Sequence, residues 1–170
     1  MATLCDLTTM MMSTPINNSY STLVKQGRAL IEGEPNLIAN LANLSALIYN
    51  SVSDLNWAGF YMVDSDSTLV LGPFQGQVAC VRIEIGKGVC GTAVATDSTQ
   101  RVDDVHAFAG HIACDAASNS ELVVPIHYRG KVIAVLDLDS PLIGRFQQQD
   151  QIGFEALITE LEAHLEKVGL

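Results

Sequence analysis

The sequence predicts a single α+β domain in which helices from both ends of the chain cover one face of an antiparallel sheet. Two segments with helical spacing of apolar residues come first, five segments rich in β-forming residues follow, and an amphipathic helical segment closes the chain. The 170 residues suit one domain of ordinary size, and a hydrophobic content of 48% is enough to build a buried core.

We expect residues 1–16 to form a flexible tail and the folded domain to span residues 17–168, with no linker or repeat inside it. From Asn17 the apolar residues Leu23, Leu30 and Ile31 have the spacing of one helical face. Pro35 suits the first turn of a second helix. The apolar stripe of that second helix consists of Leu37, Ile38, Leu41, Leu44, Ser45 and Ile48.

Three strands are expected at residues 57–63, 68–74 and 80–85, where β-forming residues are enriched. The turn residues 64–67 join the first two strands into a hairpin. Residues 86–95 indicate a glycine turn that leads into a short helix of small residues. The glycines of this turn lack the residues and spacing of a phosphate-binding loop, so we interpret them as a turn only.

Residues 97–120 are polar and irregular, and loops of this length are often functional. Two strongly apolar segments, 122–128 and 132–139, predict the last two strands, joined by a tight hairpin turn. From about Gln148 the sequence predicts an amphipathic helix whose apolar side carries Ile152, Leu157, Ile158, Leu161 and Leu165.

Charge and hydropathy exclude several classes of partner. The formal net charge of −10 repels a phosphate backbone, so no nucleic-acid partner is expected. No apolar run approaches the ~20 residues that span a bilayer, and the N-terminus lacks the pattern of a secretory signal. We therefore expect no membrane association and a reducing, cytoplasmic location.

The four cysteines, Cys5, Cys80, Cys90 and Cys114, are too few and too dispersed for a disulfide-stapled scaffold. Cys90 begins the expected short helix, and a thiol near a helix N-terminus can become a nucleophilic thiolate. The alternative is that these cysteines are inert core residues. Cys114 fits that alternative worst, because its sequence neighbours are polar.

His106, His111 and Cys114 form a second cluster in the same polar segment. Zinc could bind two imidazoles and a thiolate, with a fourth ligand from Asp103, Asp104 or Cys90. The spacing matches no strong zinc signature, so loop histidines bonded to backbone are favoured and no metal is predicted. His111 could instead support a nearby thiolate or donate a proton.

Three acidic residues, Glu121, Asp137 and Asp139, complete the candidate residues. Asp137 and Asp139 are two apart on one strand, so both point to the same face of the sheet. Carboxylates beside a core are costly unless they are paired or face a cation. They are therefore either solvated strand-end residues or a pocket for an ammonium group or a proton donor.

Longer motifs run through these elements. They are N-W-A-G-F-Y at 56–61, L-G-P-F-Q-G at 71–76, G-K-G-V-C-G at 86–91, G-H-I-A-C-D at 110–115, S-N-S-E-L-V-V-P-I at 118–126 and V-L-D-L-D-S-P at 135–141. In these motifs the chain resembles the free methionine-(R)-sulfoxide reductase family, whose members are GAF domains. The resemblance covers roughly residues 17–165. Ala109 and Ala134 depart from the proline and glycine that the family often has there.

The resemblance implies a role for each cysteine in this region. Cys114 would attack the sulfoxide sulfur, Cys80 would be the resolving cysteine, and Cys90 would be a secondary partner in the same site. The attack would leave a sulfenic acid, which a second thiol converts to a disulfide. Thioredoxin would then reduce that disulfide by exchange.

The resemblance also implies the binding groups. Glu121, Asp137 and Asp139 would bind the polar groups of the substrate or protonate its oxygen, and Trp57 and Tyr61 would enclose its methyl group. The chain would be an oxidoreductase that converts free L-methionine-(R)-S-oxide to L-methionine under oxidative stress, without metal, flavin or nucleotide cofactor.

Two further expectations come from the family. GAF domains often pair through their terminal helices, so the resemblance leaves both a monomer and a homodimer open. Many GAF domains are instead non-enzymatic modules that bind a small ligand, such as a cyclic nucleotide. The cysteine trio argues against this alternative, because a nucleotide sensor does not need it.

Overall fold

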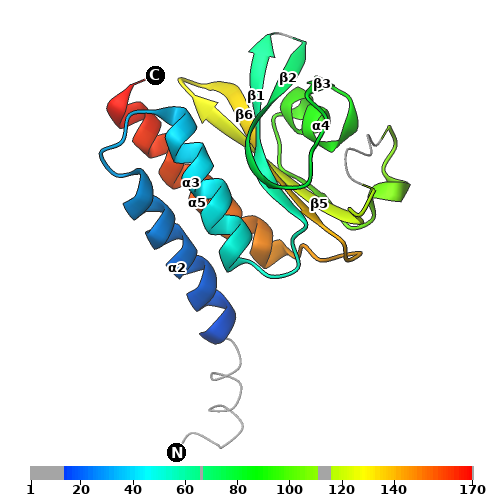
Figure 1. Ribbon diagram of the computed structural model, residues 1–170, viewed down its shortest axis with the longest axis horizontal. Helices are drawn as coiled ribbons and strands as arrows, with labels where there is room; N and C mark the ends of the chain where they lie inside the picture. Colours follow the sequence, from blue (N-terminus) through cyan, green and yellow to red (C-terminus); the bar gives the residue numbers. More distant parts are fainter. Residues whose placement is uncertain (1–13, 66, 111–115, 170) are drawn as a thin grey trace, which may run out of the picture.

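The computed structural model describes residues 14–65, 67–110 and 116–169, and Figure 1 shows how their elements are arranged. In chain order the elements are α2 (Thr14–Ile31), α3 (Leu37–Ser51), β1 (Trp57–Ser65), β2 (Thr68–Gly76), β3 (Arg82–Glu84), α4 (Gly88–Thr96), β4 (Gln100–Val102), the 3-10 helix η1 (Val105–Ala107), β5 (Ser120–Tyr128), β6 (Lys131–Ser140) and α5 (Gln148–Val168).

The strands of the described residues form one antiparallel sheet in the order β3-β2-β1-β6-β5-β4. Helices α3 and α5 pack directly on one face of it, and α2 packs against both of them. Figure 1 shows α4 on the opposite side of the sheet. The expected α+β architecture, with the terminal helices on one face, is therefore confirmed.

Strand alternation divides the core between the two faces, as the period of two requires. On β1, Ala58 and Phe60 pack toward the α2–α3–α5 layer, whereas Trp57 and Tyr61 pack toward α4. The second group of core residues joins the sheet to α4 through Val89, Cys90 and Ala93. The α4 face of the sheet therefore holds the aromatic residues and the cysteine that the sequence indicated as candidates.

Two helical predictions differ from the structure in detail. Pro35 lies one residue before the N-cap of α3, because Asn36 caps this helix by accepting a hydrogen bond from the Ala39 backbone N–H at 2.9 Å. Three residues were expected on apolar faces but are 44%, 55% and 58% exposed, namely Leu30, Ile38 and Ile152. The rest of each stripe is buried or half-buried, so the helices are placed correctly.

The sequence prediction also missed or overextended short elements. Residues 97–120 contain β4 and η1, where only irregular loop was expected. Strand β3 has three residues, so Cys80 lies just before it rather than inside it. Helix α2 begins at Thr14, three residues before the expected start, whereas the division into tail and domain stays a prediction. None of the helices that the structure describes is long and apolar enough to cross a membrane.

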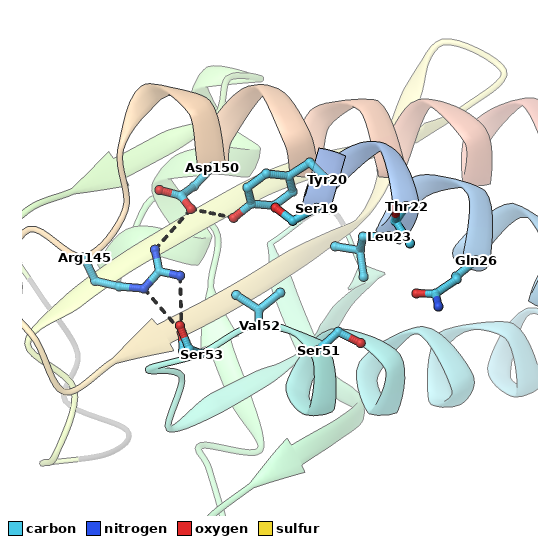
Figure 2. A pocket seen from close by; sticks show the side chains of 10 residues that line it. All are labelled: Ser19, Tyr20, Thr22, Leu23, Gln26, Ser51, Val52, Ser53, Arg145 and Asp150. Carbon is cyan, nitrogen blue, oxygen red and sulfur yellow. Dashed lines mark hydrogen bonds and ion pairs between the residues drawn. The ribbon is translucent and has the colours of Figure 1, made fainter. Parts of the chain in front are cut away.

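A buried polar lock holds α2 and α5 together beside a cavity of about 680 Å³. Tyr20 Oη donates to Asp150 Oδ1 at 2.5 Å, and Arg145 Nη1 donates to the same oxygen at 3.1 Å. Arg145 also reaches the Ser53 carbonyl through Nε and Nη2 (Figure 2). Burial, followed by the bond to Asp150, raises the pKa of Tyr20, so this phenol stays a donor.

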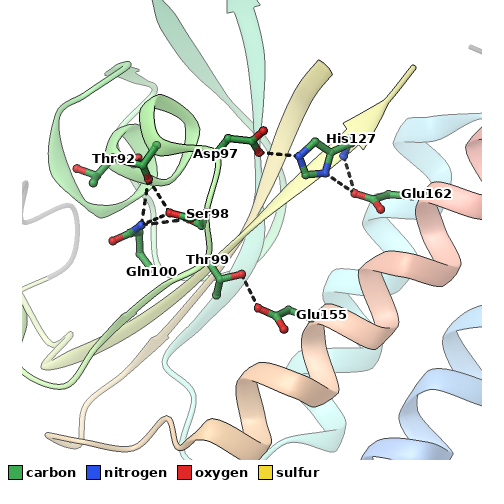
Figure 3. Close-up of polar contacts among 9 residues, drawn as sticks. Thr92, Asp97, Ser98, Thr99, Gln100, His127, Glu155 and Glu162 are labelled. Atoms are coloured by element: carbon green, nitrogen blue, oxygen red, sulfur yellow. Dashed lines mark hydrogen bonds and ion pairs between the residues drawn. The ribbon is translucent and has the colours of Figure 1, made fainter. Parts of the chain in front are cut away.

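A second polar contact joins α4, β5 and α5 at the other end of the sheet. His127 Nε2 lies 2.7 Å from Asp97 Oδ1, and its Nδ1 lies 2.8 Å from Glu162 Oε1 (Figure 3). Burial lowers the pKa of His127, but the bonds to the two carboxylates outweigh that effect and raise it on balance. The imidazole therefore helps hold the C-terminal end of α4 against the helical layer.

Candidate active site

Three neighbouring strands bring the acidic candidates into register on the α4 face of the sheet. Trp57 on β1 pairs with Asp139 on β6, which pairs in turn with Glu121 on β5. In the next row, Asp137 lies between Gly59 and Val123. The prediction that Asp137 and Asp139 share a face is thus confirmed, and Glu121 joins them there.

Helix α4 covers this row of acidic residues on the same face of the sheet. Sγ of Cys90 lies 3.9 Å from Oε1 of Glu121. The Cys90 sulfur and one carboxyl oxygen each of Glu121 and Asp137 all lie within 4.8 Å of one another. We call these three residues the buried cluster. Glu121 and Asp137 are each only 6% exposed, and Asp139 is half-buried. Solvated strand-end aspartates are therefore the wrong interpretation for Asp137.

Close approach of α4 depends on a glycine. A Cβ on Gly91 would lie 2.3 Å from the carbonyl oxygen of Glu84, which no side chain could tolerate. The first turn of α4 is also held by the Gly91 backbone N–H donating to the Lys87 carbonyl and by Gly86 donating to the Gly91 carbonyl. The short helix is thus seated against β3 at the position that brings Cys90 over β5.

Burial and crowding change the protonation of all three cluster members. Burial, then the charges of Asp137 and Asp139, raises the pKa of Glu121 well above its ordinary value. Burial also raises the pKa of Asp137 to about 6, although hydrogen bonds from Cys90, Glu121 and the Leu138 backbone oppose the rise. Both carboxyl groups therefore hold their protons to a higher pH than ordinary Glu and Asp side chains do.

The same environment acts on Cys90. Burial, followed by the charges of Asp137 and Glu121, raises the pKa of its thiol well above the ordinary value. A thiol with a raised pKa is a poor nucleophile, because the thiolate is the reactive form. The position of Cys90 at the start of α4, which suggested an activated thiolate, is thus outweighed by burial beside two carboxyl groups.

An aromatic wall borders the acidic row. The Trp57 ring stacks on Phe74 with centroids 5.2 Å apart and on Tyr61 with centroids 5.9 Å apart. A Cβ on Gly59 would lie 2.3 Å from Cβ of Phe74 and 2.6 Å from Cη2 of Trp57. Gly59 therefore leaves the space in which the two rings meet. Its cross-strand partner is Phe74.

Gly59 and Phe74 were not singled out from the sequence as site residues. The available signal was the glycine between two aromatic residues in Trp57-Ala58-Gly59-Phe60-Tyr61, since an isolated strand glycine marks a close approach. The contribution of Phe74 depends on the register of β2, which a single sequence does not reveal.

Cys80 lies beside this wall, in the segment that joins β2 to β3. Tyr61 Oη donates to the Cys80 carbonyl at 2.9 Å, and Trp57 Nε1 donates to the Gln77 carbonyl at 3.1 Å. The sulfur of Cys80 is disulfide-bonded, whereas Cys90 is a free thiol. Residues 111–115, which include His111 and Cys114, lie outside the described part of the chain.

The residues that could hold a metal ion in the structure are not the ones that the sequence suggested. His106 is exposed and its Nε2 lies 2.9 Å from Asn119 Oδ1, while Asp104 caps η1. The buried cluster, by contrast, has the spacing to hold one cation. A metal ion there would have to displace the protons that the raised pKa values of Cys90 and Glu121 keep in place.

Comparison with known proteins identifies the family. The model of the GAF domain family matches residues 38–166. The chain is 55% identical over 143 residues to the free methionine-R-sulfoxide reductase of Escherichia coli (strain K12), an alignment that covers 84% of this chain and 86% of that protein.

Two solved structures extend this similarity to three dimensions. The fRMsr of Staphylococcus aureus, solved in complex with substrate, is 51% identical with a TM-score of 0.82 and covers 86% of this chain and 95% of that one. The free methionine-R-sulfoxide reductase of Neisseria meningitidis in complex with its substrate is 41% identical with a TM-score of 0.83, covering 88% and 89%.

Proposed function

Because the chain belongs to the free methionine-(R)-sulfoxide reductase family of GAF-domain proteins, we propose that it reduces free L-methionine-(R)-S-oxide to L-methionine. The observation that carries this proposal is the buried cluster of Cys90, Glu121 and Asp137 next to an aromatic wall. Such a site offers a proton donor, an anionic group and an apolar surface, which are the three groups that the substrate requires.

Glu121 is the proposed acid. A sulfoxide oxygen leaves only when it is protonated, so a group that is still protonated at neutral pH must stand beside the attacking thiolate. The raised pKa of Glu121 supplies that proton, and the thiol of Cys90 at 3.9 Å lies where it can return one. Glu121 thus performs the acid step, and Cys90 assists it as a thiol rather than as a nucleophile.

Asp137 is the proposed anchor for the ammonium group of the free amino acid. Its Oδ1 is buried and has no hydrogen-bond partner among the residues that the structure describes. A buried carboxylate oxygen without a partner is unfavourable, and a bound ammonium would supply both charge and hydrogen bonds. Asp139, in the adjacent row, would extend this anionic surface toward Trp57.

The sulfur chemistry follows from the family resemblance. The Cys114 thiolate attacks the sulfoxide sulfur, the protonated oxygen passes to Cys114, and methionine departs. The Cys80 thiol then condenses with the Cys114 sulfenic acid, which releases water and forms a disulfide. Thioredoxin reduces this disulfide by exchange. The disulfide-bonded state of Cys80 supports its part in this cycle.

The Trp57–Tyr61 wall would contact the methyl group of the substrate. Aromatic faces make favourable contacts with sulfur and with alkyl groups next to sulfur. The ring of Trp57 is held by Phe74 on one side and by its Nε1 bond to Gln77 on the other. These contacts fix the orientation of the Trp57 ring, so the wall would favour a methyl group over an oxygen at this side of the sulfur centre.

The proposal is tested by measuring methionine release from free methionine sulfoxide with dithiothreitol as reductant, for the wild type and for Cys114→Ser. We expect turnover by the wild type and none by the variant, whose folding is checked by circular dichroism. Cys80→Ser should release one equivalent of methionine and then cycle poorly. An inactive, folded and reduced wild type would favour a GAF module that only binds a ligand.

A further inference from the structure

The segment that precedes β3 exposes two large apolar side chains on either side of Cys80. Val78 is 85% exposed, more than any other large hydrophobic side chain in the described part of the chain, and Val81 is 64% exposed. Cys80 between them is half-buried. Isolated exposed apolar residues are common, but these two flank a disulfide-bonded cysteine in the sequence.

Hydrogen bonds from residues of β1 and β2 hold the backbone of this segment in place. Trp57 Nε1 donates to the Gln77 carbonyl, Tyr61 Oη donates to the Cys80 carbonyl, and the Leu71 backbone N–H donates to the Val81 carbonyl at 2.9 Å. These three bonds hold the backbone on both sides of Val78. The two valines are thus presented outward by an ordered backbone, which lowers the entropic cost of covering them.

The segment itself carries no charged side chain, and the charge of the exposed Arg82 that follows Val81 is paired with Asp64 at 2.6 Å. Residues 68–81 contain no acidic or basic side chain, in a chain whose formal net charge is −10. A partner that approaches here therefore meets less of the repulsion or attraction that the acidic surface exerts elsewhere. Apolar surface without charge is typical of the centre of a protein–protein interface.

We propose that Val78 and Val81 form the docking surface for a protein dithiol reductant of the thioredoxin type. This inference rests on the proposed function, because only a catalytic disulfide at Cys80 requires such a partner. A disulfide is reduced only when an attacking thiolate reaches one of its sulfurs in line with the bond. The surface on either side of Cys80 is where the partner's own apolar surface must then rest.

The exchange is balanced by the partner's two thiols. A partner thiolate attacks Sγ of Cys80, the proposed disulfide bond between Cys80 and Cys114 breaks, and the Cys114 sulfur leaves as a thiolate. The partner's second thiolate then attacks the sulfur of the partner's first cysteine in the mixed disulfide, and Cys80 is released. Two electrons and two protons pass to this chain, and the partner leaves as a disulfide.

The test compares two reductants on the double variant Val78→Glu/Val81→Glu. Thioredoxin, recycled by thioredoxin reductase and NADPH, needs the docking surface, whereas dithiothreitol is too small to use it. We expect kcat/KM for thioredoxin to fall about tenfold or more, which corresponds to about 1.4 kcal/mol of lost contact. The rate with dithiothreitol should stay within about twofold of the wild type, which also shows that the variant is folded.

Ile152→Glu is the matched control, because Ile152 is 58% exposed but lies on α5. It should leave both rates unchanged. Equal losses with both reductants, or an unchanged kcat/KM for thioredoxin, would overturn the docking proposal. A wild-type dimer that becomes monomeric in the double variant would assign this surface to a second copy instead. No methionine release by the wild type with either reductant would overturn the proposed function itself.

Discussion

Sγ of Cys90 and Oε1 of Glu121 lie 3.9 Å apart, so a thiol at the start of α4 meets a carboxyl group at the start of β5 in a buried place. Burial and the nearby carboxylates raise the pKa of both groups, so each favours its protonated form more strongly than it would in water. The pair therefore places a carboxyl group and a thiol that favour their protonated forms beside the proposed site.

Glu121→Gln should lower kcat for methionine release by about 100-fold, because general acid catalysis typically contributes 10²–10⁴-fold. The amide keeps the size and can still accept a bond from Cys90, so the fold should be retained. Wild-type activity should decline as pH rises through the raised pKa of Glu121, since the acid is then ionised. Steady-state kinetics against pH, with exposed Glu84→Gln as control, measure this. A variant with normal kcat would remove Glu121 from the acid role.

Substrate binding should weaken at low pH, because Asp137 becomes protonated there. Its pKa is raised to about 6, so protonation below that pH removes the charge that we expect to hold the ammonium group. KM for the free amino acid should rise as pH falls below about 6, by about tenfold per pH unit at most, since one proton is bound. Asp137→Asn should show a high KM with no such pH dependence. A KM that is flat between pH 5 and 7 in the wild type would contradict this.

The same carboxyl group should reduce stability at neutral pH. Native Asp137 binds its proton more tightly than the unfolded chain does, so the free energy of unfolding falls as pH rises from about 3.8 to about 6. The full shift corresponds to about 3 kcal/mol, an upper limit for this group. Asp137→Asn should therefore stabilise the fold at pH 7 by about 1–3 kcal/mol while it impairs activity. Urea denaturation at pH 7, with exposed Asp103→Asn as control, measures the gain; a loss of stability would contradict it.

Gly59→Ala should displace the indole of Trp57, because the new Cβ would lie 2.6 Å from Cη2 and 2.3 Å from Cβ of Phe74. The chain contains one tryptophan, so its fluorescence reports on this ring alone. We expect a red-shifted emission and a raised KM. Gly153→Ala is the control, since its Cβ would meet the Tyr20 ring far from the site. It should cost stability without changing the emission maximum of the folded protein, and equal shifts in both variants would contradict the assignment.

Asp150→Asn should destabilise the chain by about 3 kcal/mol, because it leaves the largely buried Arg145 with only the more distant and exposed Asp54 carboxylate, at 3.9 Å, as a charge partner. The variant also weakens the bond from Tyr20 and the capping box of α5. This lock lies between α2 and α5, on the face of the sheet opposite the buried cluster. Thermal unfolding should therefore shift while kcat at 25 °C stays the same. A variant that is stable but inactive would connect the lock to the site.

The sequence predicted the fold class because its periodicities are strong and local. Alternation placed Asp137 and Asp139 on one face, and the β1–β6 register confirmed it. The burial of Asp137 could not be predicted, since it depends on α4 lying over the strand. The pairing of Cys90 with Glu121, 31 residues apart, likewise depends on tertiary packing. Short elements were missed for another reason: the three residues of β4 are too few to show a period.

The most direct test of the central claim uses the separated R and S epimers of free methionine sulfoxide. The wild type, reduced and supplied with dithiothreitol, is incubated with each epimer, and released methionine is quantified by chromatography. The account predicts release from the R epimer and only background release from the S epimer. Release from neither epimer, or from the S epimer alone, would contradict it.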